Sequence, residues 1–118
     1  MTEYKQVEIE EALQAAEEYE DVHLSVNGIK LDLPNLQSQK LPIELISAVL
    51  LVKSETVLSE QDQYKVMATV LAYFQRMRPD FWLNLNKTGN PLGYVAATLK
   101  AWATESGIDP KALRSHTS

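Results

Sequence analysis

Hydrophobic and polar residues alternate on both sides of an Asn-Gly pair in the segment VHLSVNGIKLDL, residues 22–33. Alternation with a period of two is typical of a half-buried β-strand. Asn27-Gly28 favours a two-residue type I′ turn, because both of its central positions need a positive φ. The sequence therefore predicts a β-hairpin that ends at Pro34, which has no N–H to donate to a strand partner. The predicted register pairs Val26 with Ile29, Ser25 with Lys30, Leu24 with Leu31, His23 with Asp32 and Val22 with Leu33.

The segment LPIELISAVLLVK, residues 41–53, is the most apolar stretch of the chain. Pro42 suits the first turn of a helix, where its missing N–H costs nothing. The apolar residues of this segment leave little polar face, so we expect a short helix at the centre of the fold. A buried strand is the alternative for ISAVLLV. The apolar residues that leave so little polar face are Ile43, Ile46, Val49, Leu50 and Val52.

A second helix is predicted to begin after Ser59, which resembles a capping box together with Asp62 three residues later. Pro79 disfavours helix at Arg78 and so ends or kinks this helix there. The segment DFWLNLNK, residues 80–87, is then a short helix or a turn. The side chains expected on the buried face of the second helix are Met67, Val70, Leu71, Phe74 and Met77.

Asn90-Pro91 combines an N-cap residue with a first-turn proline and predicts the start of the last helix. Gly107 is expected to end this helix in the left-handed conformation, and Ile108 supplies the apolar contact of a Schellman motif. The helix is therefore predicted to end at Gly107-Ile108. Its expected inward side chains are Leu92, Val95, Ala96, Leu99, Trp102 and Ala103.

These elements predict a mainly α fold with a small β-hairpin, in which about four helices surround one core. We divide the chain into three parts: an acidic N-terminal helix or arm (residues 1–21), a helical domain that starts with the hairpin (residues 22–108) and a polar C-terminal tail (residues 109–118). In the first part a thin apolar stripe follows helical spacing. Its members are Ile9, Ala12, Leu13, Ala16 and Tyr19.

The charge of the chain is concentrated at its beginning. The net charge is −5, but residues 1–21 hold eight acids against Lys5 alone, and the other 97 residues carry a net +2. The acidic part either steers a basic partner or is a solvated helix face that aids solubility. The overall acidity argues against nucleic acid as the main partner.

The chain has no cysteine, which excludes disulfides and thiolate chemistry. Its longest apolar run is far shorter than the roughly 20 residues that span a bilayer. The N-terminus lacks the layout of a secretion signal. We expect a protein of the cytosol that does not partner a membrane.

No catalytic constellation is visible in the sequence. His23 and His116 have no helical neighbour at metal-ligand spacing, and His23 opposite Asp32 is expected to be a cross-strand polar pair. TGNPLGY lacks the lysine and the spacing of a phosphate-binding loop. We therefore expect a protein that is not an enzyme and that uses no cofactor and no metal.

Phe81 and Trp82 are adjacent, and adjacent residues of one helix cannot both face the core. Either one of them is exposed or the segment is irregular. An exposed aromatic side chain can anchor a partner protein, whereas a small domain uses most of its aromatic residues for packing. Both interpretations stay open at this point.

Taken in order, several segments resemble a known layout: LSVNGIKLDLP, a helix opened by LP, MATVLAYFQRMRPDFWLNLNKTG and LGYVAATLKAWATESGIDPKA. Together they are similar to the tail assembly chaperones of long-tailed bacteriophages, especially those of Gram-positive hosts. The resemblance covers roughly residues 22–114 and does not explain the acidic N-terminal part.

The resemblance implies a non-catalytic factor made in the cytoplasm of the infected bacterium and absent from the mature virion. Such proteins bind the tape measure protein, keep it soluble and help to recruit the tail tube protein. A programmed frameshift commonly yields a longer form of the same protein, and self-association is a further possibility. For partner contacts the resemblance leads us to Phe81, Trp82, Trp102 and Ile108, although all four also fit a core.

A second hypothesis is a small phage-encoded inhibitor or regulator that binds a host protein. In that case the acidic residues 1–21 are the active part, and they imitate nucleic acid.

Overall fold

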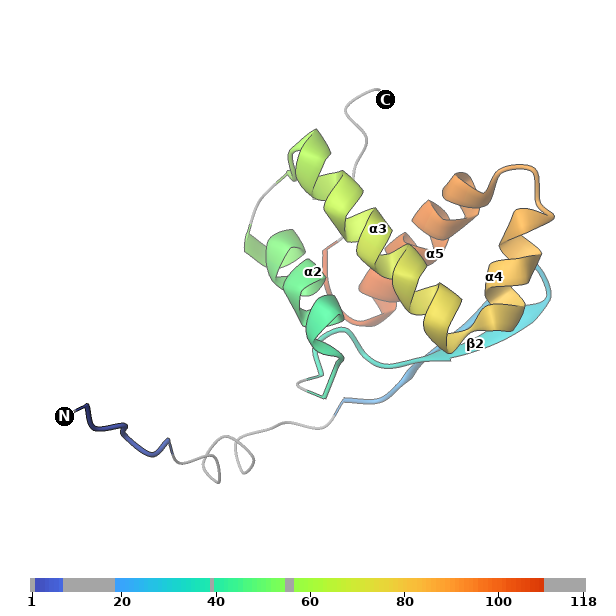
Figure 1. The fold of residues 1–118 in the computed structure, drawn as a ribbon. Helices are drawn as coiled ribbons and strands as arrows, with labels where there is room; N and C mark the ends of the chain where they lie inside the picture. The colour runs from blue at the N-terminus through green and yellow to red at the C-terminus, as the bar shows by residue number, and fades with distance from the viewer. Residues whose placement is uncertain (1, 8–18, 39, 55–56, 110–118) are drawn as a thin grey trace.

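Four helices and one antiparallel hairpin make up the part of the chain that the computed structural model describes, which is residues 2–7, 19–38, 40–54 and 57–109 (Figure 1). The fold class is thus the predicted one, mainly α with a small hairpin. Most of the predicted acidic helix and the tail after Asp109 lie outside the described residues. The elements are β1 (Val22–Val26), β2 (Ile29–Leu33), α2 (Ile43–Ser54), α3 (Glu60–Met77), α4 (Pro79–Asn86) and α5 (Pro91–Glu105).

The hairpin forms in the predicted register at all five pairs. Asn27 and Gly28 adopt φ values of 51° and 81°, as a type I′ turn requires. Leu31 and Leu33 are fully buried on one face, and on the other face His23 Nδ1 lies 2.7 Å from Asp32 Oδ1 in an exposed cross-strand pair. The alternation in the sequence therefore set which face of the ribbon is buried.

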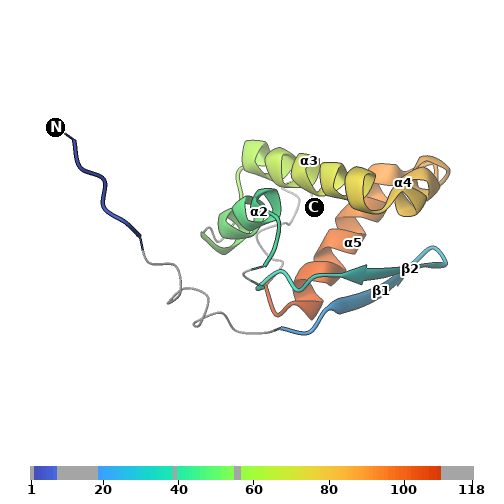
Figure 2. The ribbon, with the colours of Figure 1, turned by 60° about the horizontal axis from the view of Figure 1, so that its bottom comes forward.

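The central helix of the fold is α5. It packs on β1 with one side and on α3 and α4 with the other, so it lies between the hairpin and the α3–α4 layer (Figure 2). The prediction that the helix of residues 42–53 is central is wrong. That segment does form a helix, but α2 lies at the side of the domain and packs mainly on α3 (Figures 1 and 2).

Capping at the helix ends follows the predicted chemistry. Ser59 Oγ accepts a hydrogen bond from the Asp62 N–H (3.1 Å), and Asn90 Oδ1 accepts one from the Gly93 N–H (3.2 Å). α3 ends at Met77, directly before Arg78 and Pro79, as the proline predicts. DFWLNLNK lies almost wholly in α4, the short helix that was one of its two interpretations.

The predicted buried face of α3 is wrong at the C-terminal end of the helix, and that of α5 is wrong in its N-terminal part. Met77 is exposed because it is the last residue of α3, and the next large buried side chain is Phe81 of α4. Leu92 is exposed along with the whole first turn of α5, and Ala96 is also exposed. The stripe that α5 buries is Val95, Thr98, Leu99, Trp102 and Ala103, and α3 buries Val66, Val70, Tyr73 and Phe74.

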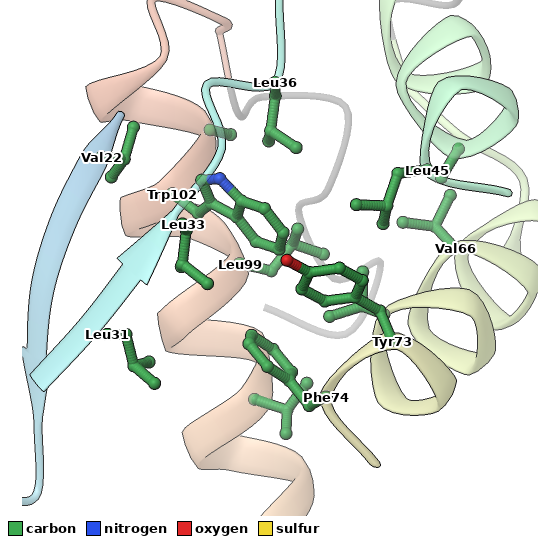
Figure 3. Packing of buried hydrophobic residues seen from close by; sticks show 14 of the residues in the cluster. Val22, Leu31, Leu33, Leu36, Leu45, Val66, Tyr73, Phe74, Leu99 and Trp102 are labelled. Atoms are coloured by element: carbon green, nitrogen blue, oxygen red, sulfur yellow. The ribbon is translucent and has the colours of Figure 1, made fainter. Parts of the chain in front are cut away.

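Trp102 joins the layers of the fold. Its indole is fully buried, with ring centroids 5.6 Å from Tyr73 and 5.9 Å from Phe74, and its Nε1–H donates to the Pro34 carbonyl at 2.8 Å. Figure 3 shows the ring between Leu33 of the hairpin and Tyr73 of α3. Phe81 extends the cluster, with its ring 4.9 Å from Phe74 in an edge-to-face arrangement.

Arg78 connects the α3–α4 corner to the hairpin. Its Nη2 donates to the Lys30 carbonyl (3.0 Å) and to Asp80 Oδ2 (3.1 Å), and its Nε donates to Asp80 Oδ1 (3.2 Å). These hydrogen bonds from the guanidinium hold the pKa of the Asp80 carboxyl below its usual value. The pKa of Arg78 is raised by the same pair.

Trp102→Phe should lower the free energy of unfolding by about 2 kcal/mol, because it leaves the Pro34 carbonyl without its donor and opens space beside Tyr73. Trp82→Phe is the matched control, since Trp82 is only half-buried. Urea unfolding followed by circular dichroism measures both variants. Equal losses in the two variants would contradict the role given to Trp102.

The Arg78–Asp80 pair should add acid sensitivity to the fold. Because the folded pKa of Asp80 lies below the unfolded value of about 4, its contribution is complete above that value and is lost as the pH falls through the folded pKa. Asp80→Asn should therefore flatten the dependence of Tm on pH below about pH 4. In an Arg78→Gln background, Asp80→Asn should not change the dependence of Tm on pH. If Asp80→Asn alone also leaves this dependence unchanged, the Arg78–Asp80 pair does not make the contribution assigned to it.

Candidate functional site

The outer face of α2 carries an apolar stripe that the described part of the chain covers only in part. Ile43 is 81% exposed and Leu50 is 60% exposed, whereas Leu45 and Ala48 on the opposite face are buried. A shallow hollow runs along the outer face. Its lining residues recur at spacings of three and one, as one face of a helix does. We call them the α2 stripe: Ile43, Ile46, Ser47, Leu50, Leu51 and Ser54.

A second hollow lies between α2 and the loop that follows the hairpin. Ile46 and Leu50 line both hollows and so form the ridge that separates them. We call the second hollow the α2 groove, and its lining residues are Leu36, Gln37, Ser38, Leu41, Ile46, Val49, Leu50 and Lys53. Stripe and groove together make a mostly apolar surface with a ridge, which is a form that a second helix can pack against.

The loop wall of the groove is anchored to the C-terminal end of α5. The Leu36 N–H donates to Ser106 Oγ (3.0 Å), and Gln37 Nε2 donates to the Ser106 carbonyl (2.6 Å). One residue further back, Asn35 Oδ1 accepts from the Gln37 N–H (2.9 Å). The groove is therefore a preformed feature, because its wall is tied to a buried helix end.

The predicted Schellman motif supplies this anchor. Gly107 has φ 80°, its N–H donates to the Thr104 carbonyl (3.0 Å), and the Ile108 N–H donates to the Ala103 carbonyl (2.9 Å). Ile108 is buried. The motif holds Ser106 at the helix end in reach of Leu36 and Gln37.

The charges on α2 lie on opposite flanks. Glu44 is paired with Arg76 of α3, and its pKa is held below the usual value first by a backbone hydrogen bond in the first turn of α2 and then by Arg76. Lys53 is the only charged residue among the described residues that line the α2 groove. The α3 flank is therefore neutralised, and the groove flank carries a cation.

The four contact residues expected from sequence take different places. Phe81 and Trp102 are fully buried, each within ring-stacking distance of Phe74, and Ile108 is buried beside Trp102 in the lining of a small apolar cavity of about 20 Å³. The burial of these three side chains agrees with the alternative interpretation from the sequence, in which they pack in the core. Trp82 is half-buried on α4, and a contact role for it stays a prediction.

The α2 stripe is the feature that sequence reasoning missed, because the helix was expected to be the central one. α2 is apolar over most of its circumference, and a helix of that kind is expected to be buried on most sides. A domain of this size has too few elements to surround both α2 and α5. Among the described residues, one face of α2 is left partly open.

Other chemistry is not found in the described part of the chain. No group of three or more His, Asp or Glu side chains there lies close enough to hold a metal ion. None of the helices among those residues is both long and apolar enough to cross a membrane. Comparison with protein families, with curated proteins and with solved structures finds no match to the chain.

Gly107→Ala should destabilise the fold more than Gly89→Ala does. Both glycines have φ near 80°, so both substitutions meet the same backbone strain, roughly 1–2 kcal/mol. A Cβ on Gly107 would also lie 2.9 Å from Gln37 Nε2, whereas one on Gly89 has no atom within 4 Å. Thermal unfolding measures the difference. In a Gln37→Ala background the excess cost at Gly107 should disappear, and an excess that persists contradicts the contact with the groove wall.

Proposed function

We propose that the chain is a non-catalytic tail assembly chaperone of a long-tailed bacteriophage. It acts in the cytoplasm of the infected host and is absent from the mature virion. The order of the segments from the hairpin to the end of α5 supports this proposal through its resemblance to that family. The acidic residues 1–21 keep the chaperone soluble while it offers an apolar surface.

The observation that carries the proposal is the α2 stripe. A tape measure protein is long and mostly helical, and before assembly its amphipathic helices expose apolar faces to water. A chaperone for such a chain needs an open apolar face of helical form, and binding is then a helix-in-groove interaction. Ile43, Ile46 and Leu50 offer such a face on a helix held by the core.

The remaining partners follow from the same proposal. The tail tube protein is recruited to the bound tape measure protein. A longer, frameshifted form would continue from residues 109–118, after the Schellman motif has already closed α5. In the genome, an open reading frame should overlap in the −1 frame and precede a long gene for a helical protein.

Leu50→Glu should reduce binding to the tape measure protein encoded in the same genome by tenfold or more, because it places a charge on the apolar ridge. Leu92→Glu is the matched control, since Leu92 is 61% exposed and Leu50 is 60% exposed. Co-expression measures the soluble fraction of the tape measure protein, and a pull-down measures its retention.

The native chain and Leu92→Glu should both keep the tape measure protein soluble, and Leu50→Glu should not. No interaction with the native chain under either condition excludes the chaperone function. If both variants lose binding to the tape measure protein equally, the binding contact lies away from α2.

A further inference from the structure

The tip of the hairpin holds the one Asn-Gly pair of the chain, Asn27-Gly28. Spontaneous deamidation of an asparagine proceeds by attack of the next backbone nitrogen on the side-chain amide, and glycine shields that nitrogen least because it has no Cβ. Both residues are exposed, so water reaches them. The other four asparagines precede a larger residue: Asn35 and Asn84 precede leucine, Asn86 precedes lysine and Asn90 precedes proline.

The folded turn keeps the two reacting atoms apart. Asn27 and Gly28 have φ values of 51° and 81°, and Val26 pairs with Ile29 across the turn. In a type I′ turn the backbone of the first central residue sets the following nitrogen nearly opposite its side chain across the Cα–C bond. The Gly28 nitrogen and Asn27 Cγ therefore meet only after the peptide between them has rotated, and this rotation opens the turn.

The side chain of Asn27 is also held from outside the hairpin. Its Nδ2 donates to Asn84 Oδ1 of α4 at 2.9 Å, so the hydrogen bond joins the tip of the hairpin to a helix that lies far along the chain. This hydrogen bond stabilises the closed turn and fixes the amide group whose nitrogen is lost in deamidation. The contact with Asn84 therefore lowers the population of the open turn in which the reaction takes place.

We propose that Asn27-Gly28 is a site of spontaneous deamidation and isomerisation whose rate is set by the contact with Asn84. In the open turn the Gly28 N–H loses its proton to hydroxide, and the nitrogen forms a bond with Asn27 Cγ. The Cγ–Nδ2 bond breaks, and Nδ2 takes a proton from water and leaves as ammonia. Water then opens the succinimide ring, either at Cγ, which leaves an aspartate, or at the backbone carbonyl carbon, which leaves an isoaspartate. This inference does not depend on the proposed function.

Both products loosen the join between the hairpin and α4. A carboxylate at position 27 has no N–H to donate to Asn84 Oδ1. An isoaspartate also adds a carbon to the main chain of a tight loop, whose dihedral angles then no longer match those of a type I′ turn. The modification is irreversible without a repair enzyme, so the hairpin tip of a modified chain stays separated from α4.

Incubation of the full chain at mildly alkaline pH, followed by peptide mapping and mass spectrometry, measures the modification at each asparagine. Deamidation should be confined to the peptide that contains Asn27, and enzymatic methylation of isoaspartate should label the same peptide. The folded chain should react about tenfold or more slowly than the same chain unfolded in guanidinium chloride, since only the open turn reacts. The rate should increase with pH, because hydroxide removes the Gly28 proton.

Asn84→Ala should speed the reaction of the folded chain about fivefold, the factor that corresponds to the net contribution of one hydrogen bond. Asn86→Ala is the matched control, because Asn86 is an exposed asparagine at the end of the same helix. Both variants should react at the native rate once unfolded. Deamidation spread equally over all asparagines, equal rates in the folded and unfolded native chain, or a folded Asn84→Ala variant that reacts no faster than Asn86→Ala overturns the proposal.

Discussion

The hydrogen bond from Trp102 Nε1 to the Pro34 carbonyl is the contact on which the arrangement of the domain depends. It joins the end of the hairpin to the central helix, and it lets an indole be buried with its one polar atom satisfied. The ring itself packs against Tyr73 and so brings α3 onto α5. One side chain therefore connects all the layers of the fold.

The same anchor determines where the open surface lies. Pro34 begins the loop that runs over the end of α5, and the contacts of Ser106 with Leu36 and Gln37 continue what Trp102 starts. This loop then forms the wall of the α2 groove. The packing of the core around Trp102 and the shape of the α2 groove are consequently coupled. A substitution at the end of α5 would alter the wall of the groove through the backbone of residues 34–38.

Local chemistry in the sequence was enough to predict the hairpin register, both N-caps, the break at Pro79 and the Schellman motif, because each depends on a few neighbouring residues. The position of α2 was not predictable in that way. Its pattern shows only that it is apolar all round, and whether such a helix is central depends on which other elements compete for the core. α5, which carries Trp102 on its buried stripe, is the central helix. Ile43 and Leu50 of α2 are therefore exposed. The same competition explains why Phe81 and Trp102 serve the core.

The composition of the α2 stripe sets how strongly it can bind. Full burial of one large aliphatic side chain contributes about 1.5–3 kcal/mol, and Ile43 and Leu50 are the two mostly exposed aliphatic side chains of the stripe. With the smaller exposed areas of the half-buried Ile46 and Leu51 added, the gross gain is about 3–6 kcal/mol, which is below the roughly 8 kcal/mol of a micromolar complex even before the cost of association is subtracted. One groove of this kind therefore binds reversibly. Reversible binding is compatible with the proposed chaperone function, in which a bound helix has to be released again and a long helical partner could engage many copies at once.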